Sequence, residues 1–308
     1  MTNDAPKDLA ASIRKRLLDR ARKTDRPFNE LLAYYGMERF LYRLSQSKHA
    51  SSFVLKGALL LHVWQGEEAR STSDIDLLGF GSNAPEAVAQ RIRECLLVVV
   101  PSDGIRFDAE SVQAEPIAEG ADDQGVRVQV QGMLGKMRLA LQVDVGFGDT
   151  LEPEPVLIDY PVLLDLPAPK LFGYARESVV AEKFEAMVKL GAANSRMKDF
   201  GDLYGLSLTM PFDGARLARA LEATLVKRGT RIQDALPLVL TPEFGLLPQK
   251  KTQWRSYLKK RRFAVRPPDS LEEVLKQIRL FLLPPVTALS QHTPFKKRWL
   301  PGGPWKDD

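Results

Sequence analysis

The fold of this chain is decided by two short stretches, Lys56-Gly57-Ala58 and Arg70-Ser71-Thr72-Ser73-Asp74-Ile75-Asp76-Leu77-Leu78. The first is a small-residue turn before a predicted helix, and the free N–H groups of such a turn suit a phosphate. The second places two carboxylates two positions apart on a predicted strand over 73–79, where side chains at i and i+2 share a face. Together the stretches predict a phosphate-binding turn beside a cation site.

The two carboxylates have the spacing of a magnesium site. Asp74 and Asp76 would have Cα atoms about 6.6 Å apart and would point the same way. Magnesium in proteins takes a few carboxylates together with phosphate oxygens and water, and paired ions serve phosphoryl transfer. A third carboxylate is expected from a neighbouring strand over 137–147. Asp144 fits, because a charge within an apolar run is costly to bury alone; a solvent-exposed strand end, or an ion pair with a nearby base, is the alternative.

Composition excludes several other classes of site. The chain has 308 residues, 44% hydrophobic and 27% charged, which is typical of one or two globular domains. Cys95 is the only cysteine, and the three histidines lack metal-ligand spacing, which argues against a disulfide framework and a zinc site. No apolar run is long enough for a bilayer, and residues 1–8 lack a signal-peptide pattern, so we expect a cytoplasmic protein with no membrane partner.

Periodicity along the chain predicts an α+β fold in four sections. Apolar spacing predicts helices over 8–24, 29–47, 84–98, 178–191, 195–207, 213–228 and 270–282, and strands over 73–79, 111–117, 125–131 and 137–147. This divides the chain into an N-terminal helical section (1–50), a mixed core (51–160), a helical C-terminal domain (161–283) and a tail (284–308). Prolines and glycines predict that the tail is irregular.

A basic segment between Lys250 and Arg266 indicates a polyanionic partner. It holds eight lysines and arginines and no acid, in a chain of net charge +5. Trp254, Tyr257 and Phe263 lie among these charges, so the segment would suit an RNA backbone with stacking platforms. The alternative is a solvated helix face whose aromatic side chains belong to the core.

Three motifs in order resemble the AbiEii family, the nucleotidyltransferase toxins of bacterial abortive-infection and toxin–antitoxin systems that include the mycobacterial MenT-type enzymes. The motifs are Phe53–Ala58 with Arg70–Asp76, then Val179–Met187, then Asn194–Leu203. The resemblance covers residues 28–262. It implies a DNA polymerase β-like nucleotidyltransferase core with N-terminal helices and a helical C-terminal domain.

The resemblance also implies roles for individual residues. Asp74 and Asp76 would bind two Mg²⁺ ions, with Asp144 as the third carboxylate that the strand pattern adds. Lys183 and Lys198 would hold nucleotide phosphates or stabilise the reaction, and Asp199 would position Lys198 or act on the acceptor hydroxyl. From the residues alone, an ion-paired seam between two helices is the alternative for Lys183, Lys198 and Asp199. Five residues are assigned to the NTP: Lys56, Gly57, Ala58, Arg70 and Thr72.

The function predicted from these motifs is Mg²⁺-dependent transfer of NMP from an NTP to an RNA acceptor. The tRNA 3′ end is the favoured acceptor, its modification would block translation and growth, and a cognate antitoxin is expected. Phosphorylation of Thr72, two residues before Asp74, would add negative charge beside the metal carboxylates and inhibit. The alternatives are a nucleotidyltransferase that modifies a small molecule such as an antibiotic, and a non-catalytic nucleotide- or RNA-binding protein.

Overall fold

The computed structural model describes residues 5–118, 124–231, 236–259 and 262–307. The chain divides into two compact units, each formed from separate segments. The first unit comprises Met1–Trp64, Ser71–Gly148 and Val156–Gly173, and the second comprises Gln65–Arg70, Asp149–Pro155 and Tyr174–Asp308. The N-terminal helices thus belong to the same unit as the mixed sheet.

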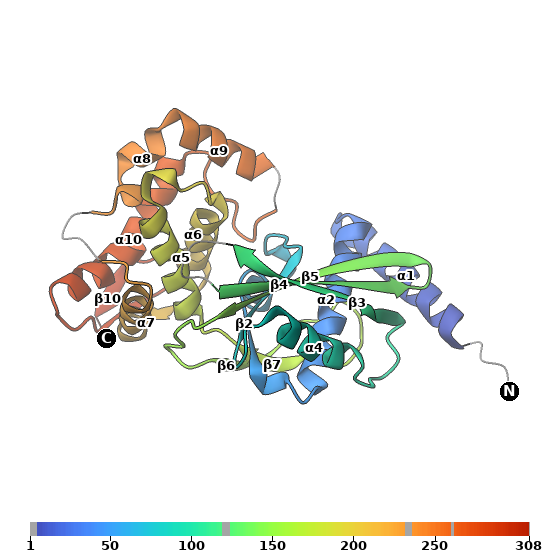
Figure 1. Cartoon of the computed structure of the whole chain (residues 1–308). Coiled ribbons are helices and arrows are strands. Elements are labelled where there is room, and N and C mark those ends of the chain that lie inside the picture. The colour runs from blue at the N-terminus through green and yellow to red at the C-terminus, as the bar shows by residue number, and fades with distance from the viewer. Residues whose placement is uncertain (1–4, 119–123, 232–235, 260–261, 308) are drawn as a thin grey trace. The chain divides into compact units, whose positions relative to one another are not determined.

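A seven-stranded mixed sheet forms the centre of the first unit (Figure 1). Its order is β3-β4-β5-β2-β1-β7-β6. The strands are β1 (Phe53–Lys56), β2 (Asp74–Gly79), β3 (Ile105–Ala118), β4 (Gln124–Leu134), β5 (Met137–Phe147), β6 (Val156–Asp159) and β7 (Lys170–Gly173). Strand β2 pairs antiparallel with β1 and parallel with β5, so the two strands that carry the predicted cation ligands are direct neighbours.

Alternation along β2 and β5 separates an apolar face from a polar one. Ile75 and Leu77 on β2, and Val143 and Val145 on β5, are fully buried. The three acidic side chains alternate with these apolar residues along the two strands and are only partly buried. Because side chains alternate across a strand, the carboxylates share the face opposite to the apolar layer.

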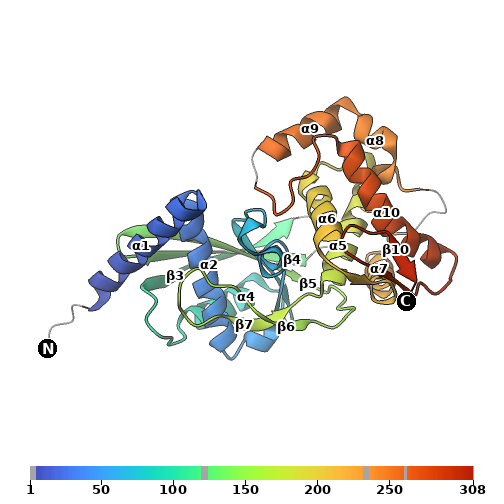
Figure 2. The ribbon, with the colours of Figure 1, turned by 180° about the vertical axis from the view of Figure 1, so that it is seen from behind.

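Helices cover the apolar layer of the first unit. They are α1 (Ala5–Thr24), α2 (Phe28–Gln46), the short α3 (Leu59–Gln65) and α4 (Pro85–Leu96). Helix α2 packs closely on β5, since a Cβ added at Gly36 would lie 3.3 Å from the Leu141 side chain. Figure 2 shows α2 against the sheet from behind. This packing leaves the opposite face of β5 to the carboxylates.

The second unit is helical, with a small sheet. Its helices are α5 (Arg176–Leu190), α6 (Met197–Thr209), α7 (Gly214–Lys227), α8 (Pro242–Leu246), α9 (Pro248–Lys259) and α10 (Leu271–Ser290). A three-stranded sheet of β8 (Phe212–Asp213), β9 (Lys297–Trp299) and β10 (Trp305–Asp307) completes it. The predicted α+β class, with N-terminal helices and a helical C-terminal part, is correct.

The prediction of an irregular tail from Pro284 is wrong. Helix α10 continues through Pro284 and Pro285 to Ser290, and the residues after it supply β9 and β10. Trp299 is completely buried and donates its indole N–H to the Ser207 carbonyl at 2.7 Å. The burial of Trp299 and stacking of Trp305 on Phe281 outweigh the helix-breaking tendency of the prolines.

None of the helices in the described ranges is both long enough and apolar enough to cross a membrane.

Candidate functional site

The three carboxylates predicted from the sequence lie together in the first unit. Parallel pairing of β2 with β5 sets Asp76 beside Asp144 and Asp74 beside Gln142. One carboxylate oxygen from each of Asp74, Asp76 and Asp144 lies within 4.8 Å of the other two. Three like charges this close repel one another unless a cation lies between them, so the cluster has the composition of a divalent cation site.

Gly57 leaves room for this cluster. It lies in the turn between β1 and α3 with φ +72°, a backbone conformation that favours glycine. A Cβ at this position would lie 1.9 Å from the Asp76 Oδ2 atom, so no other residue fits without moving that carboxylate. Lys56 ends β1 directly beside Asp76 in the antiparallel register. The turn therefore lies in close proximity to the carboxylates. Ala58, which comes next and precedes α3, is buried.

Arg127 holds the third carboxylate. From β4 it donates from Nε to Asp144 Oδ1 at 2.9 Å and from Nη2 to Asp144 Oδ2 at 2.8 Å. Gln142 also donates to Asp144 Oδ2, at 3.1 Å. The ion pair with a nearby base, which the sequence left open for Asp144, is therefore present together with the acidic cluster. A fork of this kind fixes the orientation of the carboxylate.

Thr72 faces the first carboxylate. Its hydroxyl donates to Asp74 Oδ1, and its backbone N–H donates to the Tyr34 hydroxyl at 2.9 Å. Clustered carboxylates, oriented by an arginine and a threonine and approached by a glycine turn, fit a divalent ion such as Mg²⁺. The residues that would hold the ion are Asp74, Asp76 and Asp144.

Thr72→Glu, which mimics phosphorylation, is expected to lower nucleotidyl transfer on the order of 100-fold. Its carboxylate would replace the hydroxyl that now donates to Asp74 and would repel that side chain. Initial rates with saturating Mg²⁺ measure the effect. Thr72→Gln, which is similar in size but neutral, is the matched control, and equal rates for the two variants would contradict the electrostatic explanation.

The second unit contains a buried ion network that includes two of the predicted site residues. Lys183 on α5 donates to Asp199 Oδ1 at 3.0 Å and to Asp202 Oδ2 at 2.7 Å, both on α6. Arg70 forms a two-point contact with Asp202, at 2.6 and 2.8 Å. Arg196 closes the other end on Asp199 at 2.6 Å. The ion-paired seam between helices that the sequence left open is thus what Lys183 and Asp199 form.

Charges in this network support one another. Burial opposes the charge of Lys183, but Asp199 and Asp202 outweigh it and raise the pKa of the amine. Burial would likewise raise the pKa of Asp199, but Lys183 and Arg196 lower it. A lysine ammonium has three donors, and within the described residues two of those of Lys183 are used in these contacts. Three cations, Lys183, Arg70 and Arg196, thus contact the two buried carboxylates.

Of the two site residues predicted in the third motif, only Asp199 takes part in this network. Lys198 is exposed and has no role in the contacts described above, whereas Asp199 is fully buried. Asp199 thus holds Lys183 and Arg196, not Lys198. Asp202, Arg127 and Tyr34 were missed by the sequence analysis. Asp202 had one signal, its place three residues after Asp199 on the same helix face; Arg127 and Tyr34 had none.

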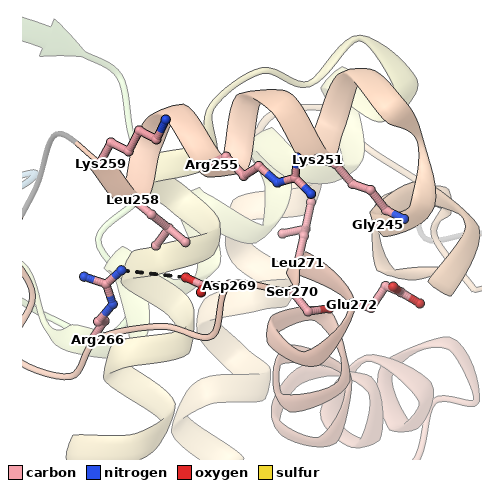
Figure 3. Close-up of a pocket in the computed structure, with 10 residues that line it drawn as sticks. All are labelled: Gly245, Lys251, Arg255, Leu258, Lys259, Arg266, Asp269, Ser270, Leu271 and Glu272. Atoms are coloured by element: carbon pink, nitrogen blue, oxygen red, sulfur yellow. Dashed lines mark ion pairs between the residues drawn. The ribbon is translucent and has the colours of Figure 1, made fainter.

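The residues of the basic segment that lie on α9 fall on two faces of this helix, one buried and one more exposed. On α9, Lys250, Trp254 and Leu258 recur at helical spacing and are buried. Lys250 donates to the Asn194 carbonyl at 2.5 Å and lies over the Phe244 ring. The basic face of α9 (Lys251, Arg255 and Lys259) lines a hollow that also includes Arg266 and the start of α10 (Figure 3). Lys260 and Arg261, also part of the predicted segment, lie outside the described residues.

The aromatic residues of this segment do not form an exposed stacking surface. Trp254 is fully buried and donates its N–H to the Pro268 carbonyl at 3.0 Å. Tyr257 packs between Trp254, whose ring is tilted with its centroid 5.2 Å away, and Phe263, which it meets edge-on at 5.3 Å. The alternative that these aromatics belong to the core is correct for Trp254, because its face of α9 is the one that packs inward.

Comparison with solved structures relates the fold to nucleotidyltransferases. MenT4, a nucleotidyltransferase toxin from Mycobacterium tuberculosis H37Rv, matches with a TM-score of 0.58 and 18% identity over 89% of each chain. A protein from H. pylori described as a nucleotidyltransferase matches with a TM-score of 0.50 and 16% identity, over 87% of this chain and 99% of its own. No curated protein sequence matches the chain. At these identities the likeness shows a shared fold.

The family is shown by a sequence model of the AbiEii nucleotidyl transferase toxins of type IV toxin–antitoxin systems, which matches residues 39–277. That span contains the clustered carboxylates, the Gly57 turn and the buried ion network. It covers well over half of the chain, and the predicted family is therefore correct. With its fold shared by MenT4 and its motifs in family order, the chain is a nucleotidyltransferase that belongs to the AbiEii toxin family.

Proposed function

We propose that this toxin transfers an NMP group from an NTP to an RNA acceptor, the tRNA 3′ end in the first place, in a reaction that depends on Mg²⁺. The observation that carries the proposal is the convergence of Asp74, Asp76 and Asp144 beside the glycine turn. Modification of the tRNA 3′ end would block aminoacylation and arrest growth in the cytoplasm. The family implies a cognate antitoxin that relieves the arrest.

In the reaction, an acceptor hydroxyl oxygen bonds to the α-phosphorus of the NTP. The bond from that phosphorus to the bridging oxygen breaks and pyrophosphate leaves with the bonding electrons, while the hydroxyl proton passes to solvent water. Bound Mg²⁺ supplies Lewis-acid stabilisation of the phosphoryl charge. The chain's own residues would orient the partners: Asp74, Asp76 and Asp144 would hold the metal, while Arg127 and Thr72 fix two of these carboxylates. The turn at Gly57 and Ala58 would offer N–H groups to phosphate oxygens.

Residues of the second unit are proposed participants because they lie in the second and third family motifs. Within the described residues, two of the three donors of Lys183 are used in ion pairs, and the ammonium would offset charge on the phosphates. Arg70 and Asp199 would act by holding Asp202 and Lys183 in place. Lys198 is exposed and would meet a ligand only from solvent.

The acceptor is proposed to contact the basic face of α9. Lys251, Arg255 and Lys259 line the hollow of Figure 3 from α9. Arg266, at the opposite wall, is 3.7 Å from Asp269, so a phosphate would compete with a weak and exposed pair. Closely spaced cations on one surface suit the regular phosphates of an RNA backbone.

Incubation with total tRNA, Mg²⁺ and each labelled NTP in turn tests the proposed function. We expect label on RNA with one or more of the four nucleotides and none with Asp76→Ala. An enzyme that labels a small molecule but no RNA would replace this proposal with the small-molecule alternative. Omission of divalent cations by chelation should also abolish labelling, and full activity in a chelator would contradict metal dependence.

Neutralising the basic face separates RNA from small acceptors. The triple variant Lys251→Gln, Arg255→Gln and Lys259→Gln is expected to raise KM for RNA about tenfold or more at 0.15 M salt, because three phosphate contacts are lost. The slope of log KM against log salt should fall by about 2. Lys189→Gln, Lys227→Gln and Lys276→Gln remove three exposed charges elsewhere in the second unit and serve as the control; equal effects of both triples would contradict a specific RNA surface.

A further inference from the structure

Thr72 lies in the short segment that leads into β2, outside the strand itself. Residues 71–73 precede the first residue of β2, so their backbone groups lie outside the sheet ladder. The Thr72 N–H is satisfied instead by a side chain from α2, since it donates to the Tyr34 hydroxyl at 2.9 Å. Tyr34 is 4% exposed. A buried tyrosine on a distant helix therefore holds the backbone two residues before Asp74.

The Tyr34 hydroxyl contacts both a backbone amide and an imidazole. A backbone N–H can only donate, so the Tyr34 oxygen accepts from Thr72. His62 Nε2 lies 2.7 Å from the same oxygen, and the tautomer of His62 decides which of the two groups donates. His62 belongs to α3, the helix that follows the Gly57 turn. Through its hydroxyl, Tyr34 on α2 thus contacts both α3, which follows the Gly57 turn, and the backbone of Thr72 two residues before Asp74.

The ring of Tyr34 is fixed on its apolar surfaces as well. Its centroid is 4.5 Å from that of the His62 ring, and the Arg26 guanidinium lies over it at 5.0 Å. Arg26 is in turn held by Glu30, at 2.7 Å. A hydroxyl on a ring held in this way has little freedom, so it sets the Thr72 backbone at a defined position.

We propose that Tyr34 is a positioning residue for the metal site and acts on Asp74 through Thr72. With its N–H anchored to Tyr34, Thr72 directs its hydroxyl to Asp74 Oδ1, which leaves the other oxygen of Asp74 for the cation. The chain of contacts runs from α2 to a carboxylate of the cluster without passing through the ladder of β2. This inference rests on the proposed function, because it assumes that Asp74, Asp76 and Asp144 bind a divalent cation.

Outer residues that orient metal ligands commonly change metal affinity by about 10- to 100-fold. Loss of the Tyr34 hydroxyl removes the anchor of Thr72 but none of the carboxylates. Tyr34→Phe is therefore expected to raise the Kd for Mn²⁺, measured by the electron paramagnetic resonance of the free ion, by about tenfold. The ring contacts with Arg26 and His62 are kept in this variant, which limits the effect to the hydroxyl.

Tyr35 provides a matched control on the same helix. It is fully buried, and its hydroxyl donates to the Asp103 carbonyl at 2.7 Å. Tyr35→Phe removes one buried hydroxyl, as Tyr34→Phe does, but none of its contacts leads to Thr72. We expect the two variants to unfold at similar urea concentrations and only Tyr34→Phe to lose Mn²⁺ affinity. Equal affinities of Tyr34→Phe and the wild type would overturn the role of Tyr34, and so would equal losses in both variants.

A double-mutant cycle tests whether Tyr34 acts through Thr72. Thr72→Val alone should weaken Mn²⁺ binding, and adding Tyr34→Phe should cause no further loss, because the second change removes an anchor with nothing left to position. Fully additive losses would show that Tyr34 acts by another route. Asp76→Ala distinguishes failure of the metal site from failure of the positioning role of Tyr34. If the wild type binds no Mn²⁺, or if Asp76→Ala binds Mn²⁺ as tightly as the wild type, the metal site is wrong. The positioning role of Tyr34 then fails as well.

Discussion

Asp76→Asn is expected to lower kcat/KM for nucleotidyl transfer by about 10³-fold or more. Asparagine has nearly the same shape but carries no charge and offers one carbonyl oxygen in place of two carboxylate oxygens. Asp76 is central to the cluster, since it lies beside Asp144 across the strands and directly faces the Gly57 turn. Loss of its charge removes electrostatic stabilisation that two remaining carboxylates cannot supply.

The same substitution should leave the fold intact. Oxygens of three carboxylates lie within 4.8 Å of one another, so removing one charge relieves repulsion in the metal-free protein. We therefore expect the unfolding temperature of metal-free Asp76→Asn to equal or exceed that of the wild type. Asp159→Asn, on β6 of the same sheet and well exposed, is the control for loss of a strand carboxylate. Activity above about one tenth of the wild-type value in Asp76→Asn would contradict a catalytic metal site.

Lys183→Met is expected to have the largest effect on stability, a loss of about 3–5 kcal/mol in the free energy of unfolding at pH 7. The variant keeps much of the side-chain volume but leaves Asp199 and Asp202 without their shared cation. Both carboxylates are buried, and among the residues that the structure describes Asp199 would keep its ion pair with Arg196 and Asp202 its ion pair with Arg70. Urea unfolding measures the loss. Lys198→Met, an exposed lysine on α6, should change stability by less than about 0.5 kcal/mol.

The pH dependence of this network has a definite sign. Lys183 and Arg196 lower the pKa of Asp199 against the effect of burial, and Arg70 and Lys183 do the same for Asp202. The stability from these carboxylates is therefore present above their unfolded pKa of about 3.9 and is lost as pH falls through the lower folded values. The raised pKa of Lys183 adds stability that is present below about pH 10.4 and is lost at higher pH. In Lys183→Met the acid unfolding midpoint should move to higher pH; an unchanged midpoint would contradict the coupling.

Much of the candidate site is readable from local sequence because its chemistry is local. Asp74 and Asp76 share a face by strand alternation, and Gly57 is required by its positive φ and by the space that Asp76 occupies. Asp144 stood out as a charge in an apolar run. We expected Asp144 to lie near Asp76 because the two strands that carry them were predicted to be neighbours. The parallel pairing of β2 and β5 confirms this.

Partners distant in sequence were not readable in this way. Arg127 meets Asp144 because β4 and β5 pair in a register that sets these two residues opposite each other. Another register would give Asp144 a different neighbour, and nothing in either strand alone fixes it. Asp202 similarly acquires Lys183 and Arg70 only when α5, α6 and the segment before β2 are packed together.

The basic segment shows how helix phase changes an interpretation based on composition. A block of cations predicted a uniform polyanion surface, but α9 turns Lys250 and Trp254 inward and Lys251 and Arg255 outward. The packing of Trp254 decides this phase, since burial of a large indole stabilises more than solvation of one extra lysine. The prediction of an irregular tail from Pro284 and Pro285 failed for a related reason. Aromatic packing around Trp299 and Trp305 stabilises the ordered structure of the C-terminal residues.

By itself the sequence determined the α+β class, the family, the carboxylates and the glycine turn. Each of these depends on residue type and on spacing within one strand, turn or helix, which the chain carries locally. Only the tertiary structure decided that Arg127 orients Asp144, that Lys183 is shared by Asp199 and Asp202, and that Tyr34 anchors Thr72. These contacts join residues that lie 16 to 38 positions apart in the sequence. Their geometry follows from strand register and helix packing, which arise from burial across the whole core.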